Sequence, residues 1–270
     1  MKRSLVFGYA ASGVSQSARE HMAFLLKAVS LHAGIPLALY EAASYEALGR
    51  AVHANKVQVA WLPPIPFIAL DRRSEVQPLV SVVRGGALRF ESVIIVNRSS
   101  MYRRLRELAG TNAGWVDPYS ASGYVFPRVE LAANGVDMKS FASETYYGAH
   151  EALVRAVALH DVDFGATHAV IGRNGEVTRA PWLDMPDLGD SIRVLAQLGS
   201  LPADVLGTRA DVDIVDQRRL TRGFVTASRD PQNRMLMLDV FGADEFRAAI
   251  PGGYDVLRAE TERASAEGIL

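Results

Sequence analysis

The sequence predicts an α/β fold divided into two lobes, each with a mixed central sheet flanked by helices. Short apolar runs alternate with amphipathic stretches along the chain, the pattern of strands and helices that follow one another. The 270 residues suffice for two hydrophobic cores, and no repeat, low-complexity tract or long linker interrupts them. We therefore expect two lobes joined by short crossing strands, with lobe one formed by residues 1–88 and 207–270 and lobe two by residues 89–206.

The N-terminal part of the chain supplies the first strands and helices. A helix is expected over residues 19–33, because apolar positions recur with helical spacing and Gly34 is suited to its end. Ser44 is placed to cap a second helix. The prolines of Pro63–Pro66 predict a rigid loop. The strands expected here are residues 4–9, 37–40, 57–62 and 76–83.

The remainder of the chain continues the alternation of strands and helices. The expected strands are residues 92–96 and 113–116, a strand-like stretch ending at 146–150, and residues 162–166 and 194–198. The expected helices are residues 101–108, 122–133, 151–159, 212–227, 234–240 and 254–266.

Composition and charge exclude several classes of protein. The 29 basic and 30 acidic residues give a formal net charge of −1, so the overall field provides no reason to bind nucleic acid or an anionic membrane surface. The chain has no cysteine, which excludes disulfides, thiolate nucleophiles and zinc–cysteine sites. No apolar run approaches the about 20 residues of a membrane-spanning helix, so we expect no direct membrane span.

The N-terminus is compatible with two compartments. Met1–Arg3 and the apolar stretch that follows are faintly similar to a signal peptide, but this stretch is at the short limit for one, and we interpret it as the first buried strand. We expect a periplasmic or membrane-associated protein if a leader was trimmed, and a cytoplasmic protein if the start at Met1 is native.

The segment Ser120-Ala121-Ser122-Gly123 is the main candidate for ligand binding. An apolar strand ends at Asp117-Pro118, and small hydroxyl residues then open a helix. A helix N-terminus presents backbone N–H groups and the positive end of the helix dipole, so this segment can hold an oxyanion without Lys or Arg. The same pattern also fits a simple serine cap followed by a glycine for tight packing.

Three further residues have a functional and a structural interpretation each. His150 opens a predicted helix, where it can donate to the same anion, although a lone histidine is more often packed or capping; its spacing to His160 and His168 does not match a metal site. Tyr45 either reaches a cleft with its hydroxyl or is a half-buried aromatic. Asp204 suits a ligand that keeps a proton to donate, because an ionised carboxylate only accepts hydrogen bonds; it equally suits a cap of the following turn.

Motifs typical of enzymes are missing from the sequence. Neither the Gly-x-Ser-x-Gly nucleophile elbow nor the Gly-x-Gly-x-x-Gly dinucleotide fingerprint occurs. We therefore expect no cofactor, no metal and no catalytic residue. If the chain were an enzyme, His150 would be the obvious general base.

Three segments, taken in order, resemble a known family. Val116–Tyr124 contains Asp-Pro-Tyr-Ser-Ala-Ser-Gly-Tyr, Tyr147–Ala152 contains Gly-Ala-His-Glu-Ala, and Leu201–Asp204 reads Leu-Pro-Ala-Asp. They are similar to Asp-Pro-x-Ser-Thr-Ser-Gly-Tyr, Gly-x-His-x-x-Ala and Ile-Pro-x-Asp of the PhnD-like family, the phosphate-, phosphite- and phosphonate-binding proteins of ABC importers. The resemblance covers nearly the whole chain. It implies a two-lobed, type II periplasmic-binding-protein fold with a ligand cleft between the lobes.

The resemblance also implies a set of ligand contacts. Tyr45 from lobe one, and Ser120, Ser122 and His150 from lobe two, would contact the oxygens of the ligand, together with Asp204 where the chain returns. Ala121 and Gly123 complete the anion cradle of residues 120–123. Further residues expected near the cleft are Tyr9, Pro64, Phe90 and Tyr147.

The chain departs from the family pattern at two of these positions. The central Thr of the family is Ala121 here, and an aromatic cleft residue that is often Tyr is Phe90. Each change removes a hydroxyl, and a missing hydrogen bond to a charged ligand costs about 1.5–3 kcal/mol. We therefore expect a ligand that is bound more weakly, is larger, or is not a phosphorus oxyanion. No acidic residue is obviously placed for the ammonium group of an aminophosphonate, and Glu91 and Asp163 are the nearby candidates.

Taken together, these features predict a solute-binding protein with a small anionic ligand. It would close over a phosphonate, phosphite or phosphate and deliver it to an ABC permease without turning it over. The alternative is a leaderless cytoplasmic enzyme, or a ligand sensor, that is built on the same fold and acts in a biosynthetic pathway.

Overall fold

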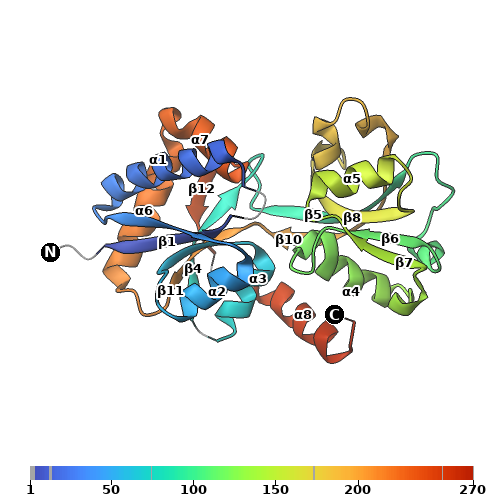
Figure 1. Cartoon of the computed structure of the whole chain (residues 1–270), viewed down its shortest axis with the longest axis horizontal. Helices are drawn as coiled ribbons and strands as arrows, with labels where there is room; N and C mark the ends of the chain where they lie inside the picture. The colour runs from blue at the N-terminus through green and yellow to red at the C-terminus, as the bar shows by residue number, and fades with distance from the viewer. Residues whose placement is uncertain (1–3, 12–13, 74, 173, 251, 270) are drawn as a thin grey trace. The chain divides into compact units, whose positions relative to one another are not determined.

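The computed structural model describes residues 4–11, 14–73, 75–172, 174–250 and 252–269, which form two compact units (Figure 1). The first unit comprises residues 1–88 and 202–253, and the second comprises residues 89–201 and 254–270. Met1–Arg3, part of the comparison with a signal peptide, lie outside the described residues. Among the described helices, none combines the length and apolar composition needed to cross a bilayer.

The first unit is built on a six-stranded mixed sheet. Its strands are β1 (Leu5–Ala10), β2 (Leu37–Ala42), β3 (Val59–Leu62), β4 (Val76–Val83), β11 (Val205–Arg209) and β12 (Glu245–Ala248). They lie in the order β12-β4-β11-β3-β1-β2. β1 pairs in parallel with β2 and β3, whereas β11 runs antiparallel to β3 and β4, and β12 antiparallel to β4.

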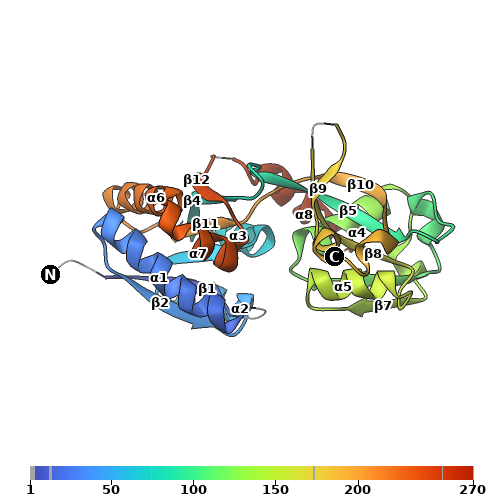
Figure 2. The ribbon, with the colours of Figure 1, turned by 90° about the horizontal axis from the view of Figure 1, so that it is seen from above.

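Helices cover both faces of this sheet (Figures 1 and 2). They are α1 (Gln16–Ala33), α2 (Tyr45–His53), α3 (Pro64–Asp71), α6 (Ile214–Arg229) and α7 (Arg234–Phe241). α1, α6 and α7 share one face, with α1 over β1 and β2 and α6 over β4 and β12, and α2 and α3 lie on the other face. Phe7 of β1 packs on Phe224 of α6 with ring centroids 6.0 Å apart, and both side chains are buried in a hydrophobic core of the unit.

The second unit also has a mixed sheet. Its strands are β5 (Arg89–Asn97), β6 (Asn112–Trp115), β7 (Ser143–Tyr146), β8 (Phe164–Ile171), β9 (Val177–Arg179) and β10 (Ile192–Pro202). The order is β10-β5-β8-β6-β7, with β9 paired to β8. β6 runs parallel to β7 and β8, whereas β5 is antiparallel to β8.

The helices of the second unit lie on opposite faces of its sheet (Figure 1). α5 (His150–Ala158) packs through Leu153 and Val157 on one face, against Val93 and other apolar side chains. α4 (Phe126–Ala133) packs through Leu131 on the other face, where Trp115 and other aromatic side chains form a second core. A π-helical turn, η2 (Ala121–Val125), precedes α4, and α8 (Asp255–Ala266) lies beside α4. The α/β class and the mixed sheets flanked by helices are as the sequence predicted.

The unit boundaries differ from the expected ones at two places. Residues 254–270, expected in lobe one, group with the second unit, because α8 packs on α4 and the Nε of Arg128 donates to the carbonyl of Ile269 at 3.2 Å. Residues 202–206, expected in lobe two, group with the first unit. There the N–H of Ala203 donates to the carbonyl of Leu88, and the carbonyl of Asp204 accepts from Val82.

Two local predictions were wrong. The prolines of Pro63–Pro66 do not form a loop: Pro64 and Pro66 occupy the first turn of α3, where a missing N–H costs no intrahelical hydrogen bond. Residues 101–108 are helical only as a short 3₁₀ turn over Leu105–Leu108, because the N–H groups of Arg103 and Arg104 bond to the Glu107 carboxylate. The short strands β9, β11 and β12 were not predicted.

Candidate functional site

Three parallel strands of the second unit end at one edge of its sheet. β6 lies between β8 and β7, and the chain leaves β6 toward α4 on one face and leaves β7 toward α5 on the other. The N–H of Tyr147 donates to the carbonyl of Trp115, and that of Gly148 to Val116, so the ends of β6 and β7 are held together. A point where successive connections go to opposite faces is where ligands bind in open α/β sheets.

The cradle of residues 120–123 lies directly beyond β6. The Oγ of Ser120 accepts a hydrogen bond from the N–H of Gly123 at 3.0 Å, so Ser120 does cap this turn. A side chain at position 123 would not fit, because its Cβ would lie 2.4 Å from Cγ2 of Val116 and 2.7 Å from Oγ of Ser120. The turn has π-helical geometry, which recurs at functional sites. Since the cap uses Oγ as an acceptor, the hydroxyl proton of Ser120 is still available for a ligand.

Ser122 and Ala121 are buried within the same turn. Ser122 is 3% exposed, and its carbonyl accepts from Oγ of Ser92 on β5 at 3.1 Å. This bond fixes the backbone of the cradle against the sheet. Ala121 is 5% exposed, and its methyl group lies at the position where the PhnD-like family usually has the hydroxyl of a Thr.

His150 is the first residue of α5 and belongs to a pair of histidines. Its Nδ1 lies 2.8 Å from Oγ1 of Thr167, and its ring centroid lies 4.5 Å from that of His168, at an interplanar angle of 83°. The ring of Phe90 packs edge-on against His168 at 6.0 Å. The sequence had suggested no role for His168. The sequence feature that could have pointed to His168 is that it is the one ionisable residue in its strand, Phe-Gly-Ala-Thr-His-Ala-Val-Ile.

Two glycines bring α5 close to the sheet. Gly114 of β6 and Gly165 of β8 are direct partners in register, and Cδ1 of Leu153 lies over both. A Cβ on Gly114 or Gly165 would be 2.5 or 2.8 Å from that methyl group. The absence of side chains at this pair therefore sets the depth at which α5 packs, and with it the position of His150.

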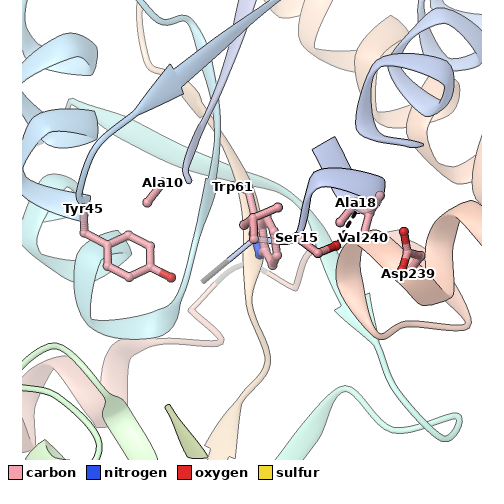
Figure 3. Close-up of a pocket in the computed structure, with 8 residues that line it drawn as sticks. Ala10, Ser15, Ala18, Tyr45, Trp61, Asp239 and Val240 are labelled. Atoms are coloured by element: carbon pink, nitrogen blue, oxygen red, sulfur yellow. Dashed lines mark hydrogen bonds between the residues drawn. The ribbon is translucent and has the colours of Figure 1, made fainter. Parts of the chain in front are cut away.

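The first unit contains a separate pocket of about 280 Å³ (Figure 3). The N-terminus of α1, capped by Oγ of Ser15, borders it, and the ring of Tyr45 from α2 lies across it from Asp239. The lining residues are Ala10, Val14, Ser15, Ala18, Tyr45, Trp61, Asp239 and Val240. Of the residues predicted for lobe one, Tyr45 is the one placed in this pocket.

Asp204 is held by a tryptophan that lines the pocket and by an arginine. Its Oδ2 accepts from Nε1 of Trp61 at 3.1 Å and from an NH2 of Arg84 at 2.8 Å. The side chains of Arg84 and Asp204 are 27% and 15% exposed, so the ion pair is largely shielded from water. The arginine compensates the charge of Asp204, so this carboxylate repels a fully ionised ligand less than an unpaired one would. The sequence alone does not reveal the ion pair of Arg84 with Asp204, because the two residues are 120 positions apart.

The remaining predicted cleft residues have structural contacts. Tyr9 is buried in the core of the first unit and its hydroxyl donates to Oε1 of Glu41 at 2.8 Å; burial and then this bond raise its pKa. Pro64 is buried in the first turn of α3. Tyr147 is half-buried against the core beneath α5, and burial raises its pKa as well.

The two acidic residues considered for an ammonium group lie at different places on the sheet, and Glu91 is the one next to Ser92 on β5. Asp163 accepts from the hydroxyl of Tyr102 and from the N–H of Asn112, which places it at the amino ends of β6 and β8, the edge opposite to the cradle. Glu91 is paired with Ala169 across β5 and β8. Asp239 is the carboxylate that lines the pocket of the first unit, where its Oδ2 accepts from Oγ of Ser17 and lies 2.7 Å from Nδ1 of His21.

Comparisons with known proteins identify the fold and the family. Among solved structures, XAC2383 from Xanthomonas citri bound to ATP matches with a TM-score of 0.81 and 22% identity, over 97% of this chain and 98% of that one. PhnD1 from Prochlorococcus marinus in complex with methylphosphonate matches with a TM-score of 0.73 and 17% identity, over 98% and 99% of the two chains. These likenesses confirm the two-lobed binding-protein fold.

Sequence comparison identifies the family. The chain is 23% identical over 254 residues to the phosphonates-binding periplasmic protein of Escherichia coli K12, which covers 92% of this chain and 73% of that protein. Residues 7–254 match a family described as ABC transporter, phosphonate, periplasmic substrate-binding protein. The chain therefore belongs to the periplasmic substrate-binding proteins of phosphonate ABC transporters.

Proposed function

We propose that the protein binds a small phosphorus oxyanion, a phosphonate, phosphite or phosphate, and hands it to an ABC permease. The observation that carries the proposal is the cradle itself, a capped turn beyond the carboxyl end of β6, together with His150 at the start of α5, the helix that follows the neighbouring strand β7. Backbone N–H groups, a serine hydroxyl and an imidazole are the donors that suit the oxygens of such an anion.

The two units have different parts in this proposal. The second unit supplies the cradle and His150, and the first unit supplies Tyr45 from its pocket. Asp204 holds Trp61 at that pocket and is itself neutralised by Arg84. Binding would therefore use residues of both units. The working compartment would be the outer side of the cytoplasmic membrane, where a permease receives its substrate.

The chemistry of the cradle bears on the choice of ligand. Ala121 and Phe90 lack the hydroxyl groups that the family usually has at these positions. Fewer donors weaken the binding of the smallest and most highly charged anions more than that of esters and substituted phosphonates. One structural neighbour held methylphosphonate and another ATP, so both belong in a ligand panel. Neither the family match nor the structural likenesses favour the alternative of a cytoplasmic enzyme or sensor.

The test is calorimetric titration with methylphosphonate, 2-aminoethylphosphonate, phosphite, phosphate and ATP, with sulfate as a control anion. We expect at least one phosphorus compound to bind, and Ser120→Ala to weaken it roughly ten- to a hundredfold, because a hydrogen bond to a charged ligand is lost. Asp213→Ala is the matched control, since Asp213 caps α6 through the N–H of Val215 and its loss affects stability alone.

Two results would contradict the proposal. One is the failure of every phosphorus compound to bind the unmodified protein. The other is a positive titration that Ser120→Ala leaves unchanged while circular dichroism shows both proteins folded.

A further inference from the structure

Two imidazole rings from different elements meet at the carboxyl edge of the second sheet. His150 comes from the first turn of α5 and His168 from β8, and their ring centroids are 4.5 Å apart. His150 is oriented by the contact of its Nδ1 with Oγ1 of Thr167, the residue just before His168.

The strand register places His168 on the cradle side of the sheet. His168 is directly opposite Ser92 in the antiparallel pair of β8 and β5, and side chains of directly opposed residues share a face. The Oγ of Ser92 donates to the carbonyl of Ser122 in the cradle. Phe90, two residues before Ser92, is on the same face and packs its ring edge-on against His168. The imidazole of His168 thus adjoins both His150 and the strand position that holds the cradle.

The spacing of the two rings restricts their charge. Two imidazolium ions at this separation repel each other, so the first proton taken up disfavours the second. An oxyanion in the cradle supplies the opposite charge and removes that penalty. The elements around the pair carry other titratable side chains, and these stay in place when His168 alone is substituted: Asp117 after β6, Tyr124 in η2, Tyr147 before α5, Glu151 in α5 and Glu91 in β5.

We propose that His168 is a ligand-binding residue and that the His150–His168 pair takes up a proton when the oxyanion binds. This inference rests on the proposed function and deepens it. Affinity then rises as the pH falls from about 8 toward 6, the range in which histidine titrates.

The experiment must separate protonation of the protein from protonation of the ligand, because phosphonates and phosphate titrate in the same range. Calorimetry in buffers of different ionisation enthalpy gives the number of protons taken up per ligand bound. With the same ligand and pH, the contribution of the ligand is equal for two protein variants and cancels in their difference. The comparison is the unmodified protein against His168→Phe, which keeps a ring beside Phe90 and His150, and His168→Gln, which keeps a donor that does not titrate.

We expect the unmodified protein, titrated with methylphosphonate at pH 7, to take up roughly 0.3–0.7 more protons than either variant. His168→Phe should weaken binding roughly tenfold at pH 6, and the difference should shrink toward pH 8.5 as the histidine loses its charge. His168→Gln should keep more affinity than His168→Phe while losing the extra proton uptake, an outcome that a purely packing role of His168 would not give.

Equal proton uptake and equal affinity of all three proteins between pH 6 and 8.5 would overturn this inference and leave the proposed function intact. Failure of the unmodified protein to bind methylphosphonate or any other compound of the panel would overturn both. If His168→Phe does not fold, as judged by circular dichroism, proton uptake and affinity are compared between His168→Gln and the unmodified protein alone.

Discussion

The Oγ of Ser120 accepts the N–H of Gly123, and this contact uses only the acceptor side of the hydroxyl. The structural role, a helix cap, and the proposed role, a donor to an oxyanion, therefore involve different parts of one group. The side chain of His150 is also oriented by a protein contact, that of its Nδ1 with Oγ1 of Thr167. At both positions the protein contact fixes the side chain that the ligand would use.

Asp117, at the end of β6, provides a pH-dependent test at the scale of one residue. Burial raises the pKa of its carboxyl group above the ordinary value of 3.8, although backbone N–H groups of Tyr119 and Ser120 oppose the shift. Because the folded protein then holds a proton that the unfolded chain has released, stability falls as the pH rises through the window between the two pKa values. Asp117→Asn should therefore increase the free energy of unfolding at pH 7, and the gain should shrink as the pH falls through that window.

Urea unfolding at several pH values between 3.5 and 7 measures this difference. Asp137→Asn is a suitable control, since the exposed Asp137 accepts the N–H of Lys139 at 2.9 Å in the way that Asp117 accepts that of Tyr119 at 2.8 Å. Little change is expected for the control. A loss of stability in Asp117→Asn at pH 7 would show that ionised Asp117 stabilises the fold.

At the scale of elements, the two helices that carry predicted ligand residues are positioned in the same way. Tyr45 opens α2 and His150 opens α5, and in each helix a leucine three residues later, Leu48 or Leu153, packs on a strand glycine. A Cβ on Gly8 of β1 would lie 2.7 Å from Cδ1 of Leu48. The close approach of helix and strand fixes the start of each helix, and with it the residue predicted to contact the ligand.

Elements with strong local signals could be predicted from the sequence, and elements that depend on distant partners could not. The Ser44 cap and the Gly34 end of α1 were predicted because their cause is local. β11 was missed, although it lies between β3 and β4, because its five residues carry no periodicity long enough to identify. The pairing of Asp204 with Arg84, and of His150 with His168, depends on sheet register, which single-sequence patterns do not reveal.

The C-terminal helix α8 allows a prediction with neighbouring residues. Leu257 is 3% exposed, whereas Val256 is 71% exposed. Leu257→Ala should reduce the free energy of unfolding by about 2–5 kcal/mol, because a buried side chain is replaced by a cavity. Val256→Ala should stay within about 0.5 kcal/mol of the unmodified protein. Denaturant titration followed by circular dichroism measures both effects, and a change as small for Leu257→Ala as for Val256→Ala would mean that burial of Leu257 does not stabilise the fold.

At the scale of the whole molecule, the chain passes between the units after residues 88, 201 and 253. Each unit nevertheless has its own sheet and buried cores. Units of this kind open with their own free energies, and hydrogen exchange of strand amides reports each one separately. Membership of a core, and not proximity in sequence, should therefore decide which amides respond to a change in packing.

Leu48 and Leu153 test this expectation as a matched pair, since both are fully buried and each docks a helix on its own sheet. Leu153→Ala should accelerate exchange of the β8 amides and leave those of β1 unchanged, and Leu48→Ala should do the reverse. Equal acceleration in both sheets by either change would show that the chain unfolds as one cooperative body.

A saturating phosphorus ligand should slow exchange in both units, because the proposed contacts come from Tyr45 in one and from Ser120 and His150 in the other. Protection confined to the second unit would mean that the cradle binds the ligand without the first unit.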